Sequence, residues 1–280
     1  MYMHNQKHFR IKGGKFMDLH DYKKVAENYD IYVNIVCPEG SALNEKLCVE
    51  FHLDLAKKYG SEGVLDIGCG TGCTTIPLLE NEYEVSSLDI SQEMINFLES
   101  KLDSKELKGD LICSDMTKFK IDRKFSLAIM PRSAFIHLTD REQQKKALQN
   151  INEHLCENGI ISLNTIVGDF SDISSEPEGG SRFLRFEYIN AYGKKEKVYN
   201  QYKYNYETQV SNGMWTFEEY NESDEIVGTK ECNIAIRFAQ KSEIENLFEL
   251  CGFEVIAIYG GYDKRACKYP GNLVWIARKI

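Results

Sequence analysis

Hydrophobic positions along residues 18–167 follow two alternating spacings. Short apolar runs, typical of buried strands, lie at residues 63–68, 83–91, 109–116, 125–131 and 160–167. Between these runs, apolar residues recur every three or four positions, as they do on one face of an amphipathic helix. Strands and helices that alternate in this order build a parallel sheet with helices on both faces, so we predict a doubly wound α/β fold.

Several of the predicted helices carry signals for where they begin or end. Gly60 follows an apolar periodic segment and is expected to stop its helix. Ser91 is expected to cap the helix after the second strand. Thr139 and Glu142 have capping-box spacing, so we expect them to open a long helix that Gly159 ends.

The pattern changes after Asp169. Between Ser181 and Phe238, four segments alternate polar and apolar residues with the period of strands, and turn-forming clusters separate them. We predict three consecutive hairpins, an antiparallel β-sheet inserted into the α/β fold. The α/β pattern then resumes with a helix, where Ser242 and Glu245 again have capping-box spacing, and ends with two closing strands.

These changes of pattern predict the domain organisation. Residues 1–17 form a flexible arm, and residues 18–180 together with 239–280 form the α/β domain. The antiparallel insertion occupies residues 181–238. A chain of 280 residues is long enough for one large domain with an insertion of this size.

Composition and charge narrow the classes of protein that fit. With 42% hydrophobic and 28% charged residues, the chain matches a globular protein with a substantial core. No apolar run approaches the roughly 20 residues of a membrane span, and the N-terminus lacks an apolar signal core. The nine cysteines are scattered without a CxxC pair, which predicts free thiols in the cytoplasm and no metal site.

The distribution of charge bears on the partner. The net charge is −9, and the lysines come in small groups among acidic residues. A nucleic-acid-binding protein usually shows a basic stripe, and none is visible here. The charge therefore argues against nucleic acid and is compatible with a small or cationic substrate.

The segment VLDIGCGTGCTT, residues 64–75, carries the clearest chemical signal, an apolar run followed by an acid and three alternating glycines. A phosphate-binding P-loop would need a lysine after the glycines, and none is present. The dinucleotide motif GxGxxG would need a third glycine where Cys73 stands. The carboxylate of Asp66, just before the first glycine, would face a pyrophosphate badly, but it suits a cationic ammonium group.

With this segment the sequence resembles the class I S-adenosylmethionine-dependent methyltransferases. Their first motif consists of two hydrophobic residues, an acid and three alternating glycines, and VLDIGCGTG matches it at every position. The resemblance covers about residues 18–167 and 240–280 in the order of the elements. It implies a Rossmann-like, seven-stranded doubly wound sheet with the last strand antiparallel. It also implies S-adenosylmethionine as cofactor, S-adenosylhomocysteine as product, and methyl transfer to nitrogen or oxygen of a small molecule.

The resemblance assigns roles to the residues of the glycine segment. Backbone N–H groups of a loop formed by Gly68, Cys69, Gly70 and Gly72 would receive the carboxylate of the cofactor's methionyl part. The side chain of Asp66 would receive the ammonium group beside it. Both groups would then lie at the carboxyl end of the first strand.

Further cofactor contacts follow at the next two strand ends. Asp89, 23 residues after Asp66, would accept both ribose hydroxyls. Asp115 would accept the adenine amino group, with Met116 packed on one side of the ring and Ile90 on the other. Taken alone, Asp89 could be a helix-start acid and Asp115 an ordinary loop carboxylate.

The segment MPRSAFIHLTD after the fourth strand is expected to face the transferred methyl group. Met130 could line the cofactor, Arg132 could bind an anionic group of the substrate, and His137 could act as a base or orient the nucleophile. The alternatives are that Arg132 pairs with a nearby acid and that His137 only packs at the start of the long helix.

Aromatic residues dominate the two remaining regions. The N-terminal segment 19–32 resembles the lid of small-molecule methyltransferases, in which Tyr22 and Tyr29 could close over the cofactor or simply anchor the segment. The aromatic side chains of the insertion could roof the active site, form a dimer interface, or build a core of their own. A monomer and a homodimer are both compatible with the sequence.

Two other functions remain open at this point. The protein could methylate RNA or another protein through the insertion, or it could bind the cofactor without catalysis. The charge pattern argues against RNA, and the intact motif set argues against a non-catalytic protein. The sequence does not identify the acceptor.

Overall fold

The computed structural model describes residues 29–36, 41, 44–168 and 180–280. The predicted arm 1–17 and Tyr22 lie outside the described residues. Within the described part of the chain, no helix is long and apolar enough to cross a membrane.

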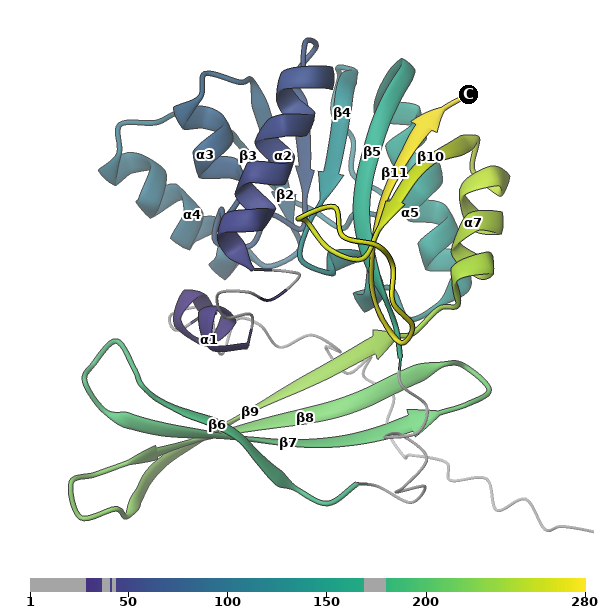
Figure 1. Ribbon diagram of the computed structural model, residues 1–280. Helices are drawn as coiled ribbons and strands as arrows, with labels where there is room; N and C mark the ends of the chain where they lie inside the picture. The colour runs from purple at the N-terminus through teal and green to yellow at the C-terminus, as the bar shows by residue number, and fades with distance from the viewer. Residues whose placement is uncertain (1–28, 37–40, 42–43, 169–179) are drawn as a thin grey trace, which may run out of the picture.

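A seven-stranded sheet forms the centre of the larger part of the molecule (Figure 1). The strand order is β10-β11-β5-β4-β1-β2-β3, in which β11 runs antiparallel to both of its neighbours and the pairs from β5 through β4, β1 and β2 to β3 are parallel. This arrangement confirms the predicted Rossmann-like fold. The strands are β1 (Val64–Ile67), β2 (Val85–Asp89), β3 (Asp110–Cys113), β4 (Phe125–Met130), β5 (Leu155–Val167), β10 (Phe253–Tyr259) and β11 (Gly271–Lys279).

Helices cover both faces of this sheet, and each face has its own apolar core. Side chains of α2 and α3 pack with β1 and β4 on one face, whereas side chains of α5 and α7 pack on the other. Leu98 and Leu102 of α4 form a smaller cluster with Cys69 of the glycine segment. The helices are α2 (Glu45–Tyr59), α3 (Thr75–Glu80), α4 (Gln92–Ser104), α5 (Arg141–His154) and α7 (Lys241–Leu250).

The helix after the second strand has the predicted cap, because Ser91 Oγ accepts the N–H of Met94. The two predicted capping boxes are wrong. The cap of α5 is Asp140 rather than Thr139, since the Asp140 carboxylate accepts the N–H groups of both Glu142 and Gln143.

The second capping-box prediction and one helix end also differ from the structure. Gln240, whose side chain makes no capping bond, precedes α7, so Ser242 lies inside the helix. Helix α5 ends at His154, and Gly159 lies within β5 because the chain joins the sheet directly from Leu155.

The insertion forms a separate four-stranded antiparallel sheet in which strands adjacent in sequence pair as hairpins. Its strands are β6 (Phe183–Ile189), β7 (Lys195–Asn205), β8 (Val210–Tyr220) and β9 (Ile226–Arg237). Helix α1 (Tyr29–Val36) lies between the two sheets (Figure 1). Tyr29, Ile31 and Ile35 of α1 pack against the apolar cluster of this sheet, which includes Trp215 and Phe217.

Arg237 fixes the end of the smaller sheet to the larger part of the molecule. Its side chain is 4% exposed, and it donates to Gln144 of α5 and to Glu243 of α7. A buried guanidinium with several hydrogen bonds resists displacement, because each broken bond would leave a charged group poorly solvated. This contact sets where the four-stranded sheet lies over the edge of the seven-stranded one.

Candidate active site

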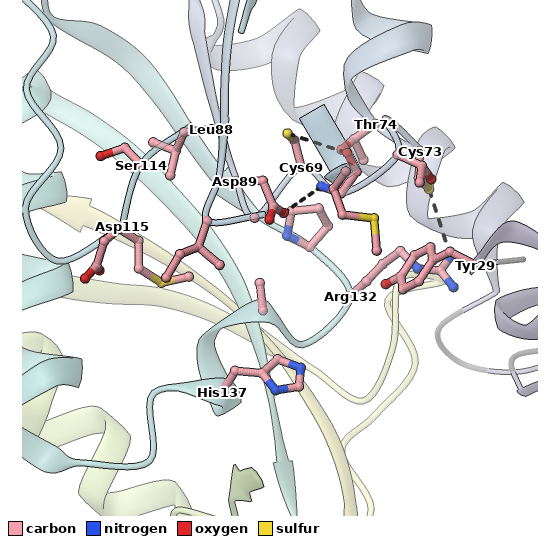
Figure 2. A pocket seen from close by; sticks show the side chains of 18 of the residues that line it. Tyr29, Cys69, Cys73, Thr74, Leu88, Asp89, Ser114, Asp115, Arg132 and His137 are labelled. Atoms are coloured by element: carbon pink, nitrogen blue, oxygen red, sulfur yellow. Dashed lines mark hydrogen bonds between the residues drawn. The ribbon is translucent and has the colours of Figure 1, made fainter. Parts of the chain in front are cut away.

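A pocket opens at the edge where the carboxyl ends of the parallel strands meet (Figure 2). Open α/β sheets place their ligand sites at this edge. The pocket encloses about 1050 Å³ of space not filled by atoms, its open mouth included. The residues assigned from the sequence that line it are Tyr29, Gly68, Cys69, Gly70, Asp89, Ile90, Asp115, Met116, Arg132 and His137.

The glycine segment turns sharply at the end of β1. Gly68, Gly70 and Gly72 have φ angles of 70°, 53° and 92°, in the left-handed region that favours glycine. Gly72 does not line the pocket but packs against α4. A Cβ at this position would lie 2.3 Å from Leu98 Cδ1, so the packing leaves no room for a side chain. The loop therefore brings its backbone to the pocket at the first two glycines.

Asp89 at the end of β2 is held in place by the backbone. Its Oδ2 accepts the N–H of Gly70 at 3.0 Å, and its Oδ1 accepts the N–H of Ser91 at 2.9 Å. Burial raises the pKa of the Asp89 carboxyl, although these hydrogen bonds oppose the shift. Each oxygen keeps a further lone pair, so the carboxylate can accept two more donors from a ligand.

Asp66 lies behind the loop and is fully buried. Its Oδ2 accepts the hydroxyls of Thr74 and Thr75, at 2.6 and 2.8 Å. Its Oδ1 is buried and has no hydrogen-bond partner in the described part of the chain. Burial raises the pKa of this carboxyl to about 6. Asp66 does not line the pocket, so a direct contact with a bound ammonium group stays a prediction.

Asp115 and Met116 line the pocket just after β3. Asp115 Oδ1 accepts both the N–H and the hydroxyl of Thr117, each at 2.8 Å, which orients the carboxylate. Figure 2 shows Ser114 and Asp115 at one end of the pocket, with Tyr29 and Arg132 at the other. Ile90, which is 68% exposed, adds an apolar side chain to the lining of the pocket.

The segment after β4 meets the sequence expectation only in part. Met130 belongs to the apolar core beneath the sheet and does not line the pocket, because it is the last residue of a buried strand. Arg132 and His137 do line the pocket, the latter from the short 3₁₀ helix Ala134–His137. The alternative that Arg132 pairs with a nearby acid is met by Glu45, whose Oε2 lies 4.0 Å from Arg132 Nη1.

Tyr29 brings helix α1 to the pocket. Burial raises the pKa of its phenol to about 12, so the hydroxyl stays protonated near neutral pH. Its ring lies 4.0 Å from the position that a Cβ on Gly70 would take. In the described part of the chain, no side chain of the four-stranded sheet lines the pocket. The insertion therefore reaches the pocket through α1.

Comparisons with known proteins agree with this geometry. Residues 64–159 match the family model described as a methyltransferase domain. A glycine/sarcosine N-methyltransferase of Parasynechococcus marenigrum is 28% identical over 82% of this chain and 76% of its own length. Other curated relatives match over 44% of their own length.

Two solved structures share the fold of the whole chain. An S-adenosylmethionine-dependent methyltransferase from Clostridium acetobutylicum has a TM-score of 0.75 at 20% identity, covering 92% of this chain and 99% of its own. A sugar N-methyltransferase from Streptoalloteichus has a TM-score of 0.66 at 14% identity, covering 99% and 98%. Residues 64–159 therefore match a methyltransferase domain, and the chain has the fold of an S-adenosylmethionine-dependent methyltransferase.

The pocket of this methyltransferase domain fits its cofactor on two independent observations. The backbone at Gly70 borders open space, where the nearest atom to an added Cβ would be Tyr29 Cε1 at 4.0 Å, and Asp89 offers two oriented acceptors beside it. The orphaned oxygen of Asp66 lies behind the same loop, which is a suitable environment for a cation. No cluster of three or more metal-ligating side chains occurs among the described residues.

Several site residues of the methyltransferase domain escaped the sequence analysis. Leu88, Met94, Leu138 and Ser114 line the pocket, and Asn164 lies buried behind the segment after β4. Leu88 and Ser114 each adjoin an assigned acid, so strand-end position could have indicated them. Asn164 is a polar residue inside the apolar run 160–167, and that contrast was the available signal.

Proposed function

We propose that this protein transfers a methyl group from S-adenosylmethionine to the nitrogen of a small-molecule amine. The observation that carries the proposal is a pocket lined by Tyr29 of α1, a helix that packs against an antiparallel sheet inserted after β5. The fold of the sugar N-methyltransferase from Streptoalloteichus extends over the whole of this chain, insertion included. A curated relative that matches over 82% of this chain is a glycine/sarcosine N-methyltransferase.

Different residues of the pocket would contact different parts of the cofactor. The carboxylate of Asp89 would accept the ribose hydroxyls, and that of Asp115 would accept the adenine amino group. Met116 and Ile90 would pack against the adenine ring, and the backbone of the glycine loop would hold the methionyl part. A cofactor held in this way would leave its methyl group within the same pocket that His137 lines.

The bound cofactor supplies an activated methyl group, since its sulfonium is already a good leaving group. The chain has to hold the acceptor nitrogen in line with that methyl group and to exclude water. His137 lies in the pocket between its two ends (Figure 2), where it can accept a proton from an ammonium acceptor or orient the neutral amine. Replacing His137 by Gln is expected to reduce turnover by about 100-fold, without loss of cofactor affinity.

Matched acceptor pairs test the choice of nitrogen. The wild-type protein is incubated with S-adenosylmethionine and an amino sugar, and in parallel with the same sugar carrying a hydroxyl in place of the amine. Glycine and sarcosine are tested beside glycolate. Mass spectrometry is expected to find a methylated amine and no methylated hydroxyl compound. Methylation only of the hydroxyl partners, of RNA or of a protein would contradict the proposal.

A further inference from the structure

Arg132 and Ser133 form an unusual pair of residues at the pocket edge. Both have positive φ angles, 54° and 68°, although neither is a glycine. A side chain with a Cβ adopts this conformation only when its surroundings impose it, and two consecutive cases are rarer still. Such backbone conformations gather at functional sites, where they aim a side chain.

Two buried side chains hold this pair. The Arg132 N–H donates to Tyr262 Oη at 2.8 Å, and the Ser133 N–H donates to Asn164 Oδ1 at 2.7 Å. Tyr262 Oη itself donates to Asn164 Oδ1 at 3.0 Å, and Asn164 Nδ2 donates to Ser133 Oγ at 2.7 Å. The four hydrogen bonds join β5, the segment after β4 and the loop between β10 and β11.

Neither of the two supporting side chains is free to move. Asn164 is 0% exposed, and Tyr262 is 3% exposed with its ring against Phe51 and His52 of α2. Loss of one member would leave buried polar groups of the others unpaired, which is costly. The network therefore fixes the backbone of Arg132 and limits the directions that its side chain can take.

The guanidinium points toward the end of the pocket that holds the glycine loop. Its Nη1 lies 3.9 Å from Cys73 Sγ, and the side chain is 13% exposed. Figure 2 shows it beside Tyr29 and Cys73, at the opposite end from Asp115. A guanidinium has five N–H donors and binds a carboxylate in a bidentate way, so it can keep its protein contacts while receiving an anion.

We propose that Arg132 binds the carboxylate of the cofactor's methionyl part, and that Asn164 and Tyr262 are positioning residues that hold Arg132 in the left-handed conformation for this task. The proposal rests on the proposed function, because it takes the orientation of the cofactor from Asp89 and Asp115. From the sequence we assigned Arg132 to an anionic group of the substrate, and this proposal assigns it to the cofactor instead. The anion would be shared between a charged side chain and the loop backbone.

Calorimetric titration with two ligands isolates the carboxylate. S-adenosylmethionine and decarboxylated S-adenosylmethionine share the ammonium, the sulfonium and the nucleoside, and they differ only in that carboxylate. In the Arg132→Met variant, affinity for S-adenosylmethionine is expected to fall about 10- to 100-fold. Affinity for the decarboxylated ligand is expected to stay within about threefold of the wild-type value, since it makes no bond to the guanidinium.

Arg278→Met is the matched control. This arginine pairs with Glu254 on β10 and lies at the opposite end of β11 from the pocket, so its replacement should leave both affinities unchanged. An equal loss of affinity for both ligands in Arg132→Met would contradict the proposal. An unchanged affinity for S-adenosylmethionine together with a raised KM for the acceptor would also contradict it, because this result would show that Arg132 binds the acceptor.

Two variants test the positioning residues. Tyr262→Phe keeps the ring and removes the hydroxyl, and Asn164→Asp keeps the shape and removes the Nδ2 donor. Each is expected to reduce S-adenosylmethionine affinity about 3- to 10-fold while leaving the decarboxylated ligand unaffected, which a merely structural loss would not do. Equal effects on both ligands would contradict the positioning role. If the wild-type protein binds neither ligand, the proposed function itself fails.

Discussion

The seven-stranded and the four-stranded sheet both carry buried polar side chains, but the groups that these side chains contact differ. In the four-stranded sheet, the Tyr188 hydroxyl and the Asn190 amide both donate to Glu196, which is 4% exposed. At the edge of the seven-stranded sheet, Asp89 and Asp115 are also oriented by hydrogen bonds, but both carboxylates line the pocket. The first set is satisfied within the sheet, and the second is left open to a ligand.

This difference separates structural from ligand-binding roles. A buried acid that is enclosed by its hydrogen-bond donors stabilises its own surroundings, whereas an oriented acid that lines a pocket at a strand end can accept further donors from a ligand. The density of tyrosines in the insertion is therefore not by itself a sign of substrate contacts. Its main connection to the pocket is the packing of α1.

The largest effect is expected from Asp89→Ala, which removes the two oriented acceptors beside the loop. Affinity for S-adenosylhomocysteine should fall at least about 100-fold, because each hydrogen bond to a charged group contributes roughly 1.5–3 kcal/mol. Calorimetry measures the affinity. Asp110→Ala, at the amino end of β3, is the control and should bind normally. An unchanged affinity in Asp89→Ala would refute the ribose role.

A moderate effect on stability is expected from Tyr188→Phe in the four-stranded sheet. The lost bond leaves one oxygen of buried Glu196 without this donor, which should lower the free energy of unfolding by about 1–3 kcal/mol. Urea denaturation measures the change, and Tyr206→Phe, at a side chain that is 56% exposed, should change it by less than about 0.5 kcal/mol. The cofactor affinity of Tyr188→Phe should match the wild type. A large loss of affinity would show that the sheet contributes directly to the pocket.

The smallest effect concerns Asp66, whose pKa burial raises from 3.8 to about 6. Because the folded state prefers the protonated acid, its contribution to stability is present below pH 4 and is lost as the pH rises through 6. Relative to the wild type, Asp66→Asn should gain about 1–2 kcal/mol of unfolding free energy between pH 4.5 and pH 7.5. Denaturation of both proteins at the two pH values gives this difference. A difference independent of pH would show that Asp66 is charged throughout this range.

Local sequence predicted the features that depend on neighbours in the chain. The glycine loop and Asp89 follow from one motif and one strand end, and the inner face of α4 follows from its periodicity. The prediction that Met130 lines the cofactor differs from the structure, because an apolar run does not show at which residue the buried strand ends and the pocket begins. Asp140 replaced Thr139 as a cap because adjacent residues compete for the same N–H groups.

Contacts between distant parts of the chain were beyond the sequence. Tyr262 meets Asn164 across 98 residues, and this meeting depends on β11 inserting between β5 and β10. The same topology brings the loop containing Tyr262 to the edge where Arg132 lies. The left-handed backbone at Arg132 and Ser133 likewise follows from these partners rather than from the residue types.

The binding of S-adenosylmethionine by the glycine-loop pocket is the central claim, and calorimetric titration of the wild-type protein tests it most directly. S-adenosylmethionine and NADH are titrated separately into the same preparation. The account predicts saturable 1:1 binding of S-adenosylmethionine and no heat of binding with NADH. Tight binding of NADH, with none of S-adenosylmethionine, would contradict it.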